Sequence, residues 1–314
     1  MNQSPKTVFV TGGAGFIGSN LIPKLLSQGH KVIVFDNFST GVMANLEAFK
    51  SHTNFAFEKG DIRDREAVQS ALQNVTSIIH LAAQIDVTAS VENPLQTHEI
   101  NVTGTLNLLQ EAAKNKVEKF VFASSTAVYG ETTLLPIKEE TPTKPISPYA
   151  ASKAAAESYL SAYAHCFGLE TITLRFFNVY GKKNHNSPYS GVITKFLQKA
   201  QNNQNLTVEG DGEQTRDFIH VSDVVNGIAL ALNSKQTPGE VFNICTGKPT
   251  SINQLAEIIK KITCKDLSVK HGPPRVGDIK HNYGNPTKTK KALRFEATVD
   301  LAAGLRTLVE NENP

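Results

Sequence analysis

Short apolar segments alternate with amphipathic segments along the first half of the chain. The apolar segments are rich in valine, isoleucine and phenylalanine, which favours buried β-strands, and the apolar spacing of the other segments favours helices. We predict strands at 6–11, 31–35, 54–58, 75–80, 119–123 and 170–176, and helices at 19–28, 65–72 and 94–114. Strands separated by helices of this length indicate right-handed crossovers and a parallel sheet, and therefore an α/β fold.

The alternation fades near residue 180. Residues 182–188 are polar and rich in turn-forming residues. We therefore predict one domain at 1–180 and a smaller second domain at 181–314 that covers a ligand site. Residues 130–148 are rich in proline, threonine and glutamate, which predicts an exposed loop.

Three regularly spaced glycines follow the first predicted strand. Gly12, Gly15 and Gly18 lie between this strand and the next predicted helix. In such a turn the first glycine lets the chain turn sharply, the second lets the backbone approach a pyrophosphate, and the third lets the helix pack on the strand. The helix N-terminus then points its N–H groups at the phosphates. This pattern predicts a dinucleotide site.

An acidic residue follows the second predicted strand. Asp36 lies 18 residues after Gly18 (36 − 18 = 18), about where a carboxylate that binds the ribose is expected. A carboxylate accepts hydrogen bonds from a ribose diol and repels a 2′-phosphate, and residues 37–40 contain no arginine. The pattern favours NAD over NADP. The alternative is an aspartate that only caps a helix.

Candidate ligand-binding residues follow several of the predicted strands. Gly12, Asp36, Asp61, Ala82 and Ser125 all fall at strand carboxyl ends. Ligands of open parallel sheets bind beyond the carboxyl ends of the strands. These residues are therefore expected to surround one site.

A tyrosine and a lysine stand four residues apart at a predicted helix start. Pro148 precedes Tyr149, and an alanine-rich run leads past Lys153. Four residues are about one helical turn, so both side chains project from one face. A phenol has a pKa of about 10, and a nearby ammonium can lower it toward 7 for roughly 4 kcal/mol of differential interaction. The pair is a candidate general base, the alternative being a surface pair.

Two arginines in the second half lie in predicted turns rich in glycine or proline. Arg216 belongs to the segment 210–218, and Arg275 belongs to the segment 273–279. Guanidinium groups suit diphosphates. Each arginine alone is more often part of a surface ion pair, but together they suggest a second phosphate-bearing ligand.

Composition excludes several classes of function. The chain of 314 residues is 40% hydrophobic and 19% charged, and its formal net charge is +3. This charge is too small, and the basic residues are too scattered, to predict nucleic-acid binding. The three cysteines are widely separated, so we expect neither a disulfide framework nor a metal site.

The apolar segments are also too short to span a membrane. No apolar stretch approaches the roughly 20 residues that span a bilayer. Glycines interrupt the apolar run after Val10, so the N-terminus does not resemble a secretion signal. We expect a cytoplasmic protein without a membrane partner.

The motifs together resemble the extended short-chain dehydrogenase/reductase family, in particular the UDP-galactose (UDP-glucose) 4-epimerase group. The resemblance runs from residues 11–15 through 36–41 to 275–278. It implies an NAD-binding, doubly wound parallel Rossmann sheet at 1–180 and a smaller C-terminal domain at 181–314 that mainly binds a nucleotide sugar. It also implies that the chain crosses between the domains, with segments near 218–246 returning to the first.

The resemblance assigns roles to individual residues. Ser125, Tyr149 and Lys153 match the catalytic set. The residues assigned to the cofactor are Gly12, Gly15, Phe16, Ile17, Gly18, Asp36, Asn37, Ser39, Thr40, Gly41, Asp61, Ile62, Leu81, Ala82, Ala83, Asn101, Tyr149, Lys153 and Phe177. The residues assigned to the substrate are Ser125, Tyr149, Asn178, Val192, Thr207, Arg216, Arg275, Asp278 and Asn282.

The activity implied by the resemblance is epimerisation of UDP-glucose and UDP-galactose by transient oxidation. Tyr149 takes the proton of the sugar 4-hydroxyl while hydride moves from C4 to NAD, and Ser125 aligns that hydroxyl. The 4-keto sugar then turns over in the site and takes the hydride back on its other face. NAD is regenerated in each cycle and is expected to stay bound.

Three alternatives remain. Nucleotide-sugar 4,6-dehydratases and decarboxylases of this fold carry an acidic residue just after the catalytic hydroxyl, whereas Thr126 and Ala127 follow Ser125 here. Another NAD-dependent sugar-nucleotide oxidoreductase would turn over external cofactor. A non-catalytic NAD-sensing protein would typically lack the tyrosine or the lysine.

The resemblance also bears on the range of sugars. The residue seven places after Arg275 is expected to stand beside the C2 substituent, which identifies Asn282. An asparagine leaves room for an N-acetyl group, so UDP-N-acetylglucosamine and UDP-N-acetylgalactosamine are possible further substrates. A shift by one residue places Tyr283 there instead and reverses the inference.

A homodimer is implied as well. The segments 94–114 and 149–167 carry apolar residues on more than one helix face, and only one face can cover the sheet. These residues are Leu106, Leu108, Leu109, Tyr159, Leu160 and Tyr163. The resemblance implies a four-helix bundle between two copies, and the alternative is that loops cover the second face.

Overall fold

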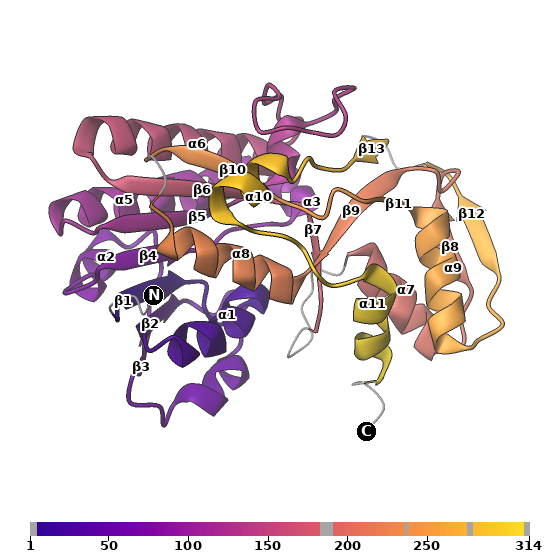
Figure 1. The fold of residues 1–314 in the computed structure, drawn as a ribbon, viewed down its shortest axis with the longest axis horizontal. Helices are drawn as coiled ribbons and strands as arrows, with labels where there is room; N and C mark the ends of the chain where they lie inside the picture. Colours follow the sequence, from indigo (N-terminus) through magenta and orange to yellow (C-terminus); the bar gives the residue numbers. More distant parts are fainter. Residues whose placement is uncertain (1–4, 183–190, 236–237, 275–278, 311–314) are drawn as a thin grey trace.

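A parallel sheet forms the centre of the protein (Figure 1). The computed structural model describes residues 5–182, 191–235, 238–274 and 279–310. The seven strands lie in the order β10-β6-β5-β4-β1-β2-β3, and every neighbouring pair is parallel. They are β1 (Thr7–Thr11), β2 (Lys31–Asp36), β3 (Phe55–Lys59), β4 (Ser77–His80), β5 (Lys119–Ser125), β6 (Glu170–Phe176) and β10 (Glu240–Ile244).

The strand order confirms the predicted fold class. The chain runs outward from β1 to β3, then returns to β4 and runs outward on the other side, so the order reverses between β1 and β4. Ligands of doubly wound sheets bind at such a reversal, beyond the strand carboxyl ends. The six predicted strands all occur, with bounds that differ by two residues or fewer.

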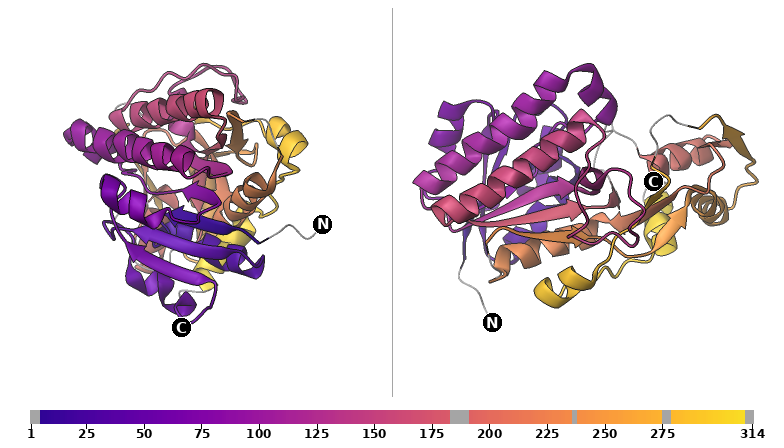
Figure 2. Two further views of the ribbon diagram at one scale, coloured as in Figure 1. Left: turned by 90° about the vertical axis from the view of Figure 1, so that its left-hand side faces the viewer. Right: turned by 90° about the horizontal axis from the view of Figure 1, so that it is seen from above.

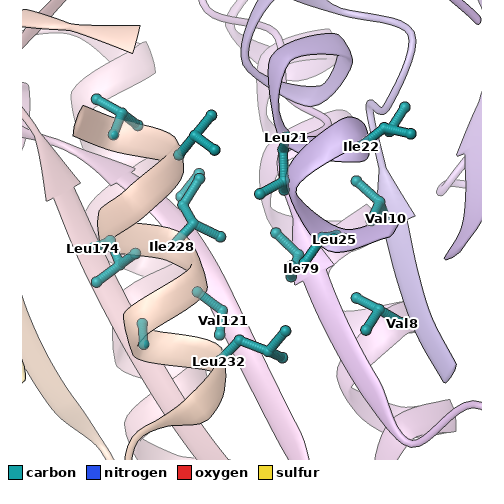
Figure 3. Packing of buried hydrophobic residues seen from close by; sticks show 14 of the residues in the cluster. Val8, Val10, Leu21, Ile22, Leu25, Ile79, Val121, Leu174, Ile228 and Leu232 are labelled. Carbon is teal, nitrogen blue, oxygen red and sulfur yellow. The ribbon is translucent and has the colours of Figure 1, made fainter. Parts of the chain in front are cut away.

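Helices cover both faces of this sheet (Figures 1 and 2). One face carries α1 (Phe16–Ser27) and α8 (Val221–Asn233), and the other carries α2 (Arg65–Ala71), α5 (Gly104–Lys114) and α6 (Pro148–Phe167). Val8 and Val10 pack toward the first face and Phe9 toward the second, as the side-chain alternation of a strand requires. Figure 3 shows Leu25 and Ile228 among the side chains on the first face.

The predicted helix at 94–114 contains an irregular turn. It consists of α4 (Pro94–His98), a π-helical turn at Glu99–Thr103, and α5, and a short helix α3 (Val87–Glu92) precedes it. A π turn widens the helix by one residue and displaces the hydrogen-bonding ladder. The π turn contains Asn101, one of the residues assigned to the cofactor.

The segment 130–148 is not simply an exposed loop, contrary to the prediction. Ile137 is 0% exposed. Its N–H donates to the Tyr283 carbonyl at 2.9 Å, and its carbonyl accepts from the Asn285 N–H at 2.8 Å. The segment is therefore fixed against a distant part of the chain.

A second group of elements lies beside one end of the sheet, on the right of Figure 1. Its strands are β7 (Asn178–Tyr180), β8 (Leu206–Glu209), β9 (Thr215–His220), β11 (Pro249–Ser251), β12 (Val269–Gly272) and β13 (His281–Asn282). Its helices are α7 (Val192–Gln201), α9 (Ile252–Thr263) and α11 (Leu301–Glu310). These elements share a hydrophobic core of their own, which includes Phe196, Leu255 and Leu305.

The chain passes between the two groups more than once. β9 pairs with β7, β11 and β13, whereas α8 and β10, which follow β9, lie on the central sheet. The short α10 (Thr287–Leu293) also packs on β10. The domain boundaries at 1–180 and 181–314 stay a prediction. Among the described residues, no helix has both the length and the apolar character that crossing a membrane requires.

Candidate active site

The glycine-rich turn connects β1 to α1. Gly12 has φ +68°, and a Cβ atom on it would lie 2.7 Å from the Ala82 nitrogen. A Cβ on Gly18 would lie 2.5 Å from the Gly12 carbonyl oxygen, so a larger residue would push the helix away from the turn. No side chain of the described residues caps α1 at Gly15, so a phosphate can cap it instead. The turn fits the pyrophosphate of a dinucleotide.

Asp36 stands at the end of β2 and holds this turn. Its carboxylate accepts from the N–H of Ala14 at 2.9 Å and from the N–H of Phe38 at 2.8 Å. Burial raises the pKa of Asp36, and these two hydrogen bonds oppose the rise. Each carboxylate oxygen has a further lone pair, so a ribose hydroxyl can still donate to it.

Asp61 is neutralised by an arginine that the sequence analysis did not single out. Arg63 donates to the Asp61 carboxylate from Nε at 3.0 Å and from Nη2 at 2.8 Å, and Asn37 donates from Nδ2 at 2.9 Å. These bonds, with those of Arg63 first, hold the pKa of Asp61 at about 2. Arg63 follows Asp61 by two residues, and this proximity in sequence is the signal that could have found it.

The segment after β4 faces the glycine turn. The Ala82 N–H donates to the Thr11 hydroxyl at 3.2 Å. Asn101, in the π turn, is 2% exposed; its side chain accepts from the Gln84 N–H at 2.8 Å and donates to Ser152 Oγ at 2.9 Å. In this structure the Asn101 side chain therefore braces the protein around the cofactor site.

The other residues assigned to the cofactor vary in exposure. Phe16 and Ile17 begin α1, and Ile62 and Phe177 are buried. Leu81 and Ala83 are partly exposed, whereas Asn37, Ser39 and Thr40 are exposed beyond β2. Gly41 packs on Ala14, because a Cβ on Gly41 would lie 2.8 Å from the Ala14 carbonyl carbon.

The predicted catalytic helix begins as expected. The Ser147 hydroxyl accepts from the Ala150 N–H at 3.1 Å and caps α6, and Pro148 occupies the first turn. The Tyr149 N–H donates to Ser90 Oγ at 3.1 Å, which fixes the helix start against α3. Tyr149 and Lys153 are one turn apart on this helix.

Ser125 and Tyr149 share a hydrogen bond at the end of β5, and the Lys153 side chain reaches the same strand at Ala123. Burial raises the pKa of Tyr149, and a hydrogen bond with Ser125 opposes the rise. Lys153 is 3% exposed; its Nζ donates to the Ala123 carbonyl at 2.9 Å and lies 4.7 Å from the centroid of the Phe122 ring. Burial lowers the pKa of Lys153 to about 7. The expected lowering of the Tyr149 pKa is therefore wrong for this structure, because burial outweighs the other effects.

A buried ion pair lies near Lys153, the predicted catalytic lysine, and the sequence analysis missed it. Glu157 lies one turn after Lys153 and pairs with Arg175 of β6 at 2.6 Å; the two side chains are 9% and 6% exposed. The Ser124 hydroxyl also donates to Glu157. The Glu157 carboxylate raises the pKa of Lys153 against the effect of burial. The ion pair thus joins β6 to α6, and its carboxylate acts on the pKa of Lys153.

Apart from Ser125 and Tyr149, the described residues assigned to the substrate lie on the second group of elements. Asn178 donates from Nδ2 to the Asp217 carbonyl at 3.3 Å, and Val192 begins α7. Thr207 is exposed on β8, and its hydroxyl accepts from Lys199 Nζ at 2.7 Å.

Of the two arginines predicted to bind a phosphate, the structure describes Arg216. Arg216 lies on strand β9 and not in the predicted turn. Arg275 and Asp278 fall outside the described residues.

Asn282 contacts the residue that follows the predicted catalytic serine, although the two are far apart in sequence. Its Oδ1 accepts from the hydroxyl of Thr126, the residue after Ser125, at 3.1 Å. Asn282 is 4% exposed, on a strand that pairs with Arg216. The structure thus brings the predicted sugar-pocket residue next to the catalytic set.

The comparison with known proteins agrees with this geometry. A sequence model of the NAD dependent epimerase/dehydratase family matches residues 8–245. The chain belongs to this family. NAD is the family's cofactor. The glycine turn and Asp36, both predicted to bind it, lie together, since Asp36 accepts from the Ala14 N–H.

Individual members of the family match along almost the whole chain. The chain is 35% identical over 303 residues to a UDP-glucose 4-epimerase of Mycolicibacterium smegmatis, covering 96% of each chain. The crystal structure of the Thermotoga maritima UDP-glucose 4-epimerase with UDP-glucose has a TM-score of 0.91 at 38% identity, covering 97% of each chain. A UDP-N-acetylglucosamine 4-epimerase of Methanobrevibacter ruminantium, in complex with UDP-N-acetylmuramic acid, has a TM-score of 0.92 at 37% identity, covering 98% of each chain.

Proposed function

We propose that the protein is an NAD-dependent nucleotide-sugar 4-epimerase that interconverts UDP-glucose and UDP-galactose. The observation that carries the proposal is the meeting of Ser125, Tyr149 and Lys153 at the edge of the sheet that also holds the glycine turn. NAD, when bound beside the glycine turn, would supply the hydride-transfer chemistry at C4 of the sugar. The similarity to UDP-glucose 4-epimerases along nearly the whole chain supports this activity.

Tyr149 is the group that takes the proton of the sugar 4-hydroxyl in this proposal. Burial opposes the phenolate, so neighbouring groups must stabilise it. Ser125 provides a hydrogen bond. An ammonium has three donors and the Ala123 carbonyl takes one, so Lys153 has donors left for the phenolate and the cofactor.

The main alternative is a nucleotide-sugar 4,6-dehydratase or a decarboxylase. Dehydration needs a further acid beside the sugar to protonate the leaving hydroxyl. Thr126 and Ala127 follow Ser125, and the Thr126 hydroxyl already donates to Asn282. Glu157 is buried and paired with Arg175, so it is not available to a sugar. These observations favour the epimerase over the dehydratase, and the intact catalytic set speaks against a non-catalytic NAD-sensing protein.

The direct test is to incubate purified protein with UDP-glucose without added NAD and to follow UDP-galactose by NMR. We expect interconversion without added cofactor, because the cycle regenerates NAD in place. An acid extract of the same protein is expected to contain NAD or NADH. An extract without either nucleotide, together with activity only on added NADP, would contradict both the cycle and the role of Asp36. Accumulation of a 4-keto-6-deoxy sugar would favour the dehydratase.

Asn282 offers a test of the sugar range. We propose that it borders the pocket for the C2 substituent, since Thr126 ties it to the catalytic serine. UDP-N-acetylglucosamine is then expected to be a second substrate, and Asn282→Tyr is expected to suppress turnover of that sugar selectively. Filling a pocket can exclude a substrate by more than the roughly 1–3 kcal/mol of one methylene.

The control for this test is Asn282→Ser, which leaves the pocket open at the same buried position. Kinetics with both sugars separate the two variants, because a general loss of folding lowers both activities together. If the wild-type protein converts only the unsubstituted hexoses, the assignment of Asn282 is wrong and Tyr283 becomes the candidate.

We further propose a homodimer. Leu108, Leu109 and Leu160 face the core, so they cannot form a partner surface. Exposed apolar residues nevertheless lie on the packed helices α3, α4 and α6, namely Val91 (61% exposed), Leu95 (77%), Tyr159 (41%) and Phe167 (63%). Such exposed apolar groups are typical of interfaces. Sedimentation as a monomer at micromolar concentration would contradict the dimer.

The cytoplasmic location stays a prediction.

A further inference from the structure

One buried histidine belongs to neither the catalytic set nor the cofactor assignment. His80 ends β4 and is 1% exposed. Its Nδ1 lies 2.7 Å from the Thr11 hydroxyl, and its Nε2 lies 2.9 Å from the Thr105 hydroxyl. Thr11 precedes the glycine turn and Thr105 lies in α5, just after the π turn. The imidazole ring therefore spans from the cofactor turn to the irregular helix.

The neighbouring hydrogen bonds fix which nitrogen carries the proton. Thr105 Oγ1 donates to the Asn101 carbonyl at 2.6 Å, so it accepts from His80 Nε2–H. A neutral ring that is protonated at Nε2 has Nδ1 as an acceptor. The Thr11 hydroxyl, which accepts from the Ala82 N–H, then donates to Nδ1.

This chain reaches the catalytic tyrosine. Asn101 lies within the π turn, where the ladder of backbone hydrogen bonds is displaced, and the Thr105 hydroxyl supplies a bond to its carbonyl. The Asn101 side chain donates to Ser152 Oγ at 2.9 Å, and Ser152 donates to the Tyr149 carbonyl at 2.7 Å. The catalytic helix is thus tied at its first turn to the position of the π turn.

A second contact leads from His80 to the catalytic lysine. The rings of His80 and Phe122 have centroids 5.6 Å apart, and Lys153 Nζ lies 4.7 Å from the centroid of Phe122. Burial, and then the charge of Lys153, lower the pKa of His80 to about 3. The ring therefore stays neutral, and its hydrogen bonds do not change over the working pH range.

We propose that His80 is a positioning residue that sets the place of Tyr149 relative to the cofactor turn. It acts through Thr105, Asn101 and Ser152, and the inference rests on the catalytic role proposed for Tyr149. The competing explanation is that His80 only fills the core beside Phe120 and Phe122. The two explanations differ in what happens when the shape is kept and the hydrogen bonds are lost.

The test compares kinetic constants for UDP-glucose epimerisation in four variants. His80→Leu fills similar space without hydrogen bonds, and Thr105→Val breaks the next link. Both are expected to lower kcat about 10-fold or more with KM nearly unchanged, because displacing a reacting group by about 1 Å can cost 100-fold. His80→Gln places an amide near the position of Nε2 and is expected to restore most of the turnover, whereas His80→Asn, which reaches only the position of Nδ1, is not.

Two comparisons make the kinetic test specific. Ser77→Ala alters another fully buried residue of β4, whose hydroxyl has no hydrogen-bond partner within the described ranges, and is expected to leave kcat unchanged. The double variant His80→Leu/Thr105→Val is expected to lose no more than the worse single variant, as links of one chain should. Wild-type kcat in both single variants, or an additive loss in the double variant, would overturn the proposal.

Hydrogen–deuterium exchange separates this proposal from the proposed function. In His80→Leu, peptides covering 98–105 and 147–153 are expected to exchange faster than in the wild type, whereas α8 on the opposite face is not. If His80→Leu shows this faster exchange but the wild-type protein does not epimerise UDP-glucose, the link between His80 and the start of α6 is retained and the proposed epimerase activity is refuted. Unchanged exchange in both peptides would refute the link, whatever the activity. If His80→Leu does not fold, Thr105→Val decides the same question.

Discussion

Tyr149→Phe is expected to lower kcat for UDP-glucose epimerisation by at least about 100-fold, the lower end for loss of a general base. The change removes the phenol oxygen that hydrogen-bonds with Ser125 and retains the ring. KM is expected to change less, because the lost interaction acts on the proton that moves during the reaction. Initial rates at saturating UDP-glucose measure the effect.

Tyr159→Phe is the matched control, since Tyr159 lies on the same helix and is 41% exposed. It is expected to keep wild-type turnover. Lys153→Ala is expected to lose activity as well. Without its ammonium nothing replaces the stabilisation of the phenolate, so the acid limb of the pH profile moves to higher pH. Wild-type turnover in Tyr149→Phe would show that another residue is the base.

Glu157→Gln is expected to lower the free energy of unfolding by about 3–5 kcal/mol, the range for removing one partner of a buried ion pair. The Arg175 guanidinium would remain buried without its negative partner, to which it now donates hydrogen bonds at 3.0 Å (Nε to Oε1) and 2.6 Å (Nη2 to Oε2). The pKa of Lys153 is also expected to fall, because the Glu157 carboxylate now raises it. Urea unfolding measures the change in stability.

Glu257→Gln provides the control for that measurement. Glu257 pairs with Lys260 at 3.0 Å on α9, where the two side chains are 54% and 27% exposed. Such a pair is worth about 0–1 kcal/mol, because water screens it. Equal losses in the two variants would contradict the importance of burial for the Glu157–Arg175 pair.

The sequence by itself determined the sheet and the centre of the site. Apolar β-branched runs predicted the strands, since the strands of a parallel sheet are buried on both faces and read as continuous apolar segments. The strand 170–176 agrees with β6 at both ends. The glycine turn was predicted equally well, because it depends on nearby backbone positions, of which Gly12 and Gly18 have no space for a side chain.

Local spacing also determined the catalytic helix. Ser147, Pro148, Tyr149 and Lys153 lie within two turns, and capping and helical periodicity act over that distance. The carboxyl ends of parallel strands meet at one edge of the sheet, so strand prediction alone placed Gly12 with the end of β5.

Only the tertiary structure decided which buried groups pair. Glu157 finds Arg175 on β6, His80 finds Thr105 on α5, and no periodicity encodes such contacts. The burial of a residue is likewise not encoded in its own segment, because it depends on what the rest of the chain places nearby. The proline-rich segment 130–148 looked exposed, yet Ile137 is buried against a segment near residue 284.

The charge state of the site likewise came from packing. The spacing of one helical turn between Tyr149 and Lys153 predicted that the lysine lowers the pKa of Tyr149. It could not supply the desolvation that raises the Tyr149 pKa and lowers that of Lys153 to about 7. Desolvation is a property of the space around a group, and residues from β5, α6 and β6 together form that space.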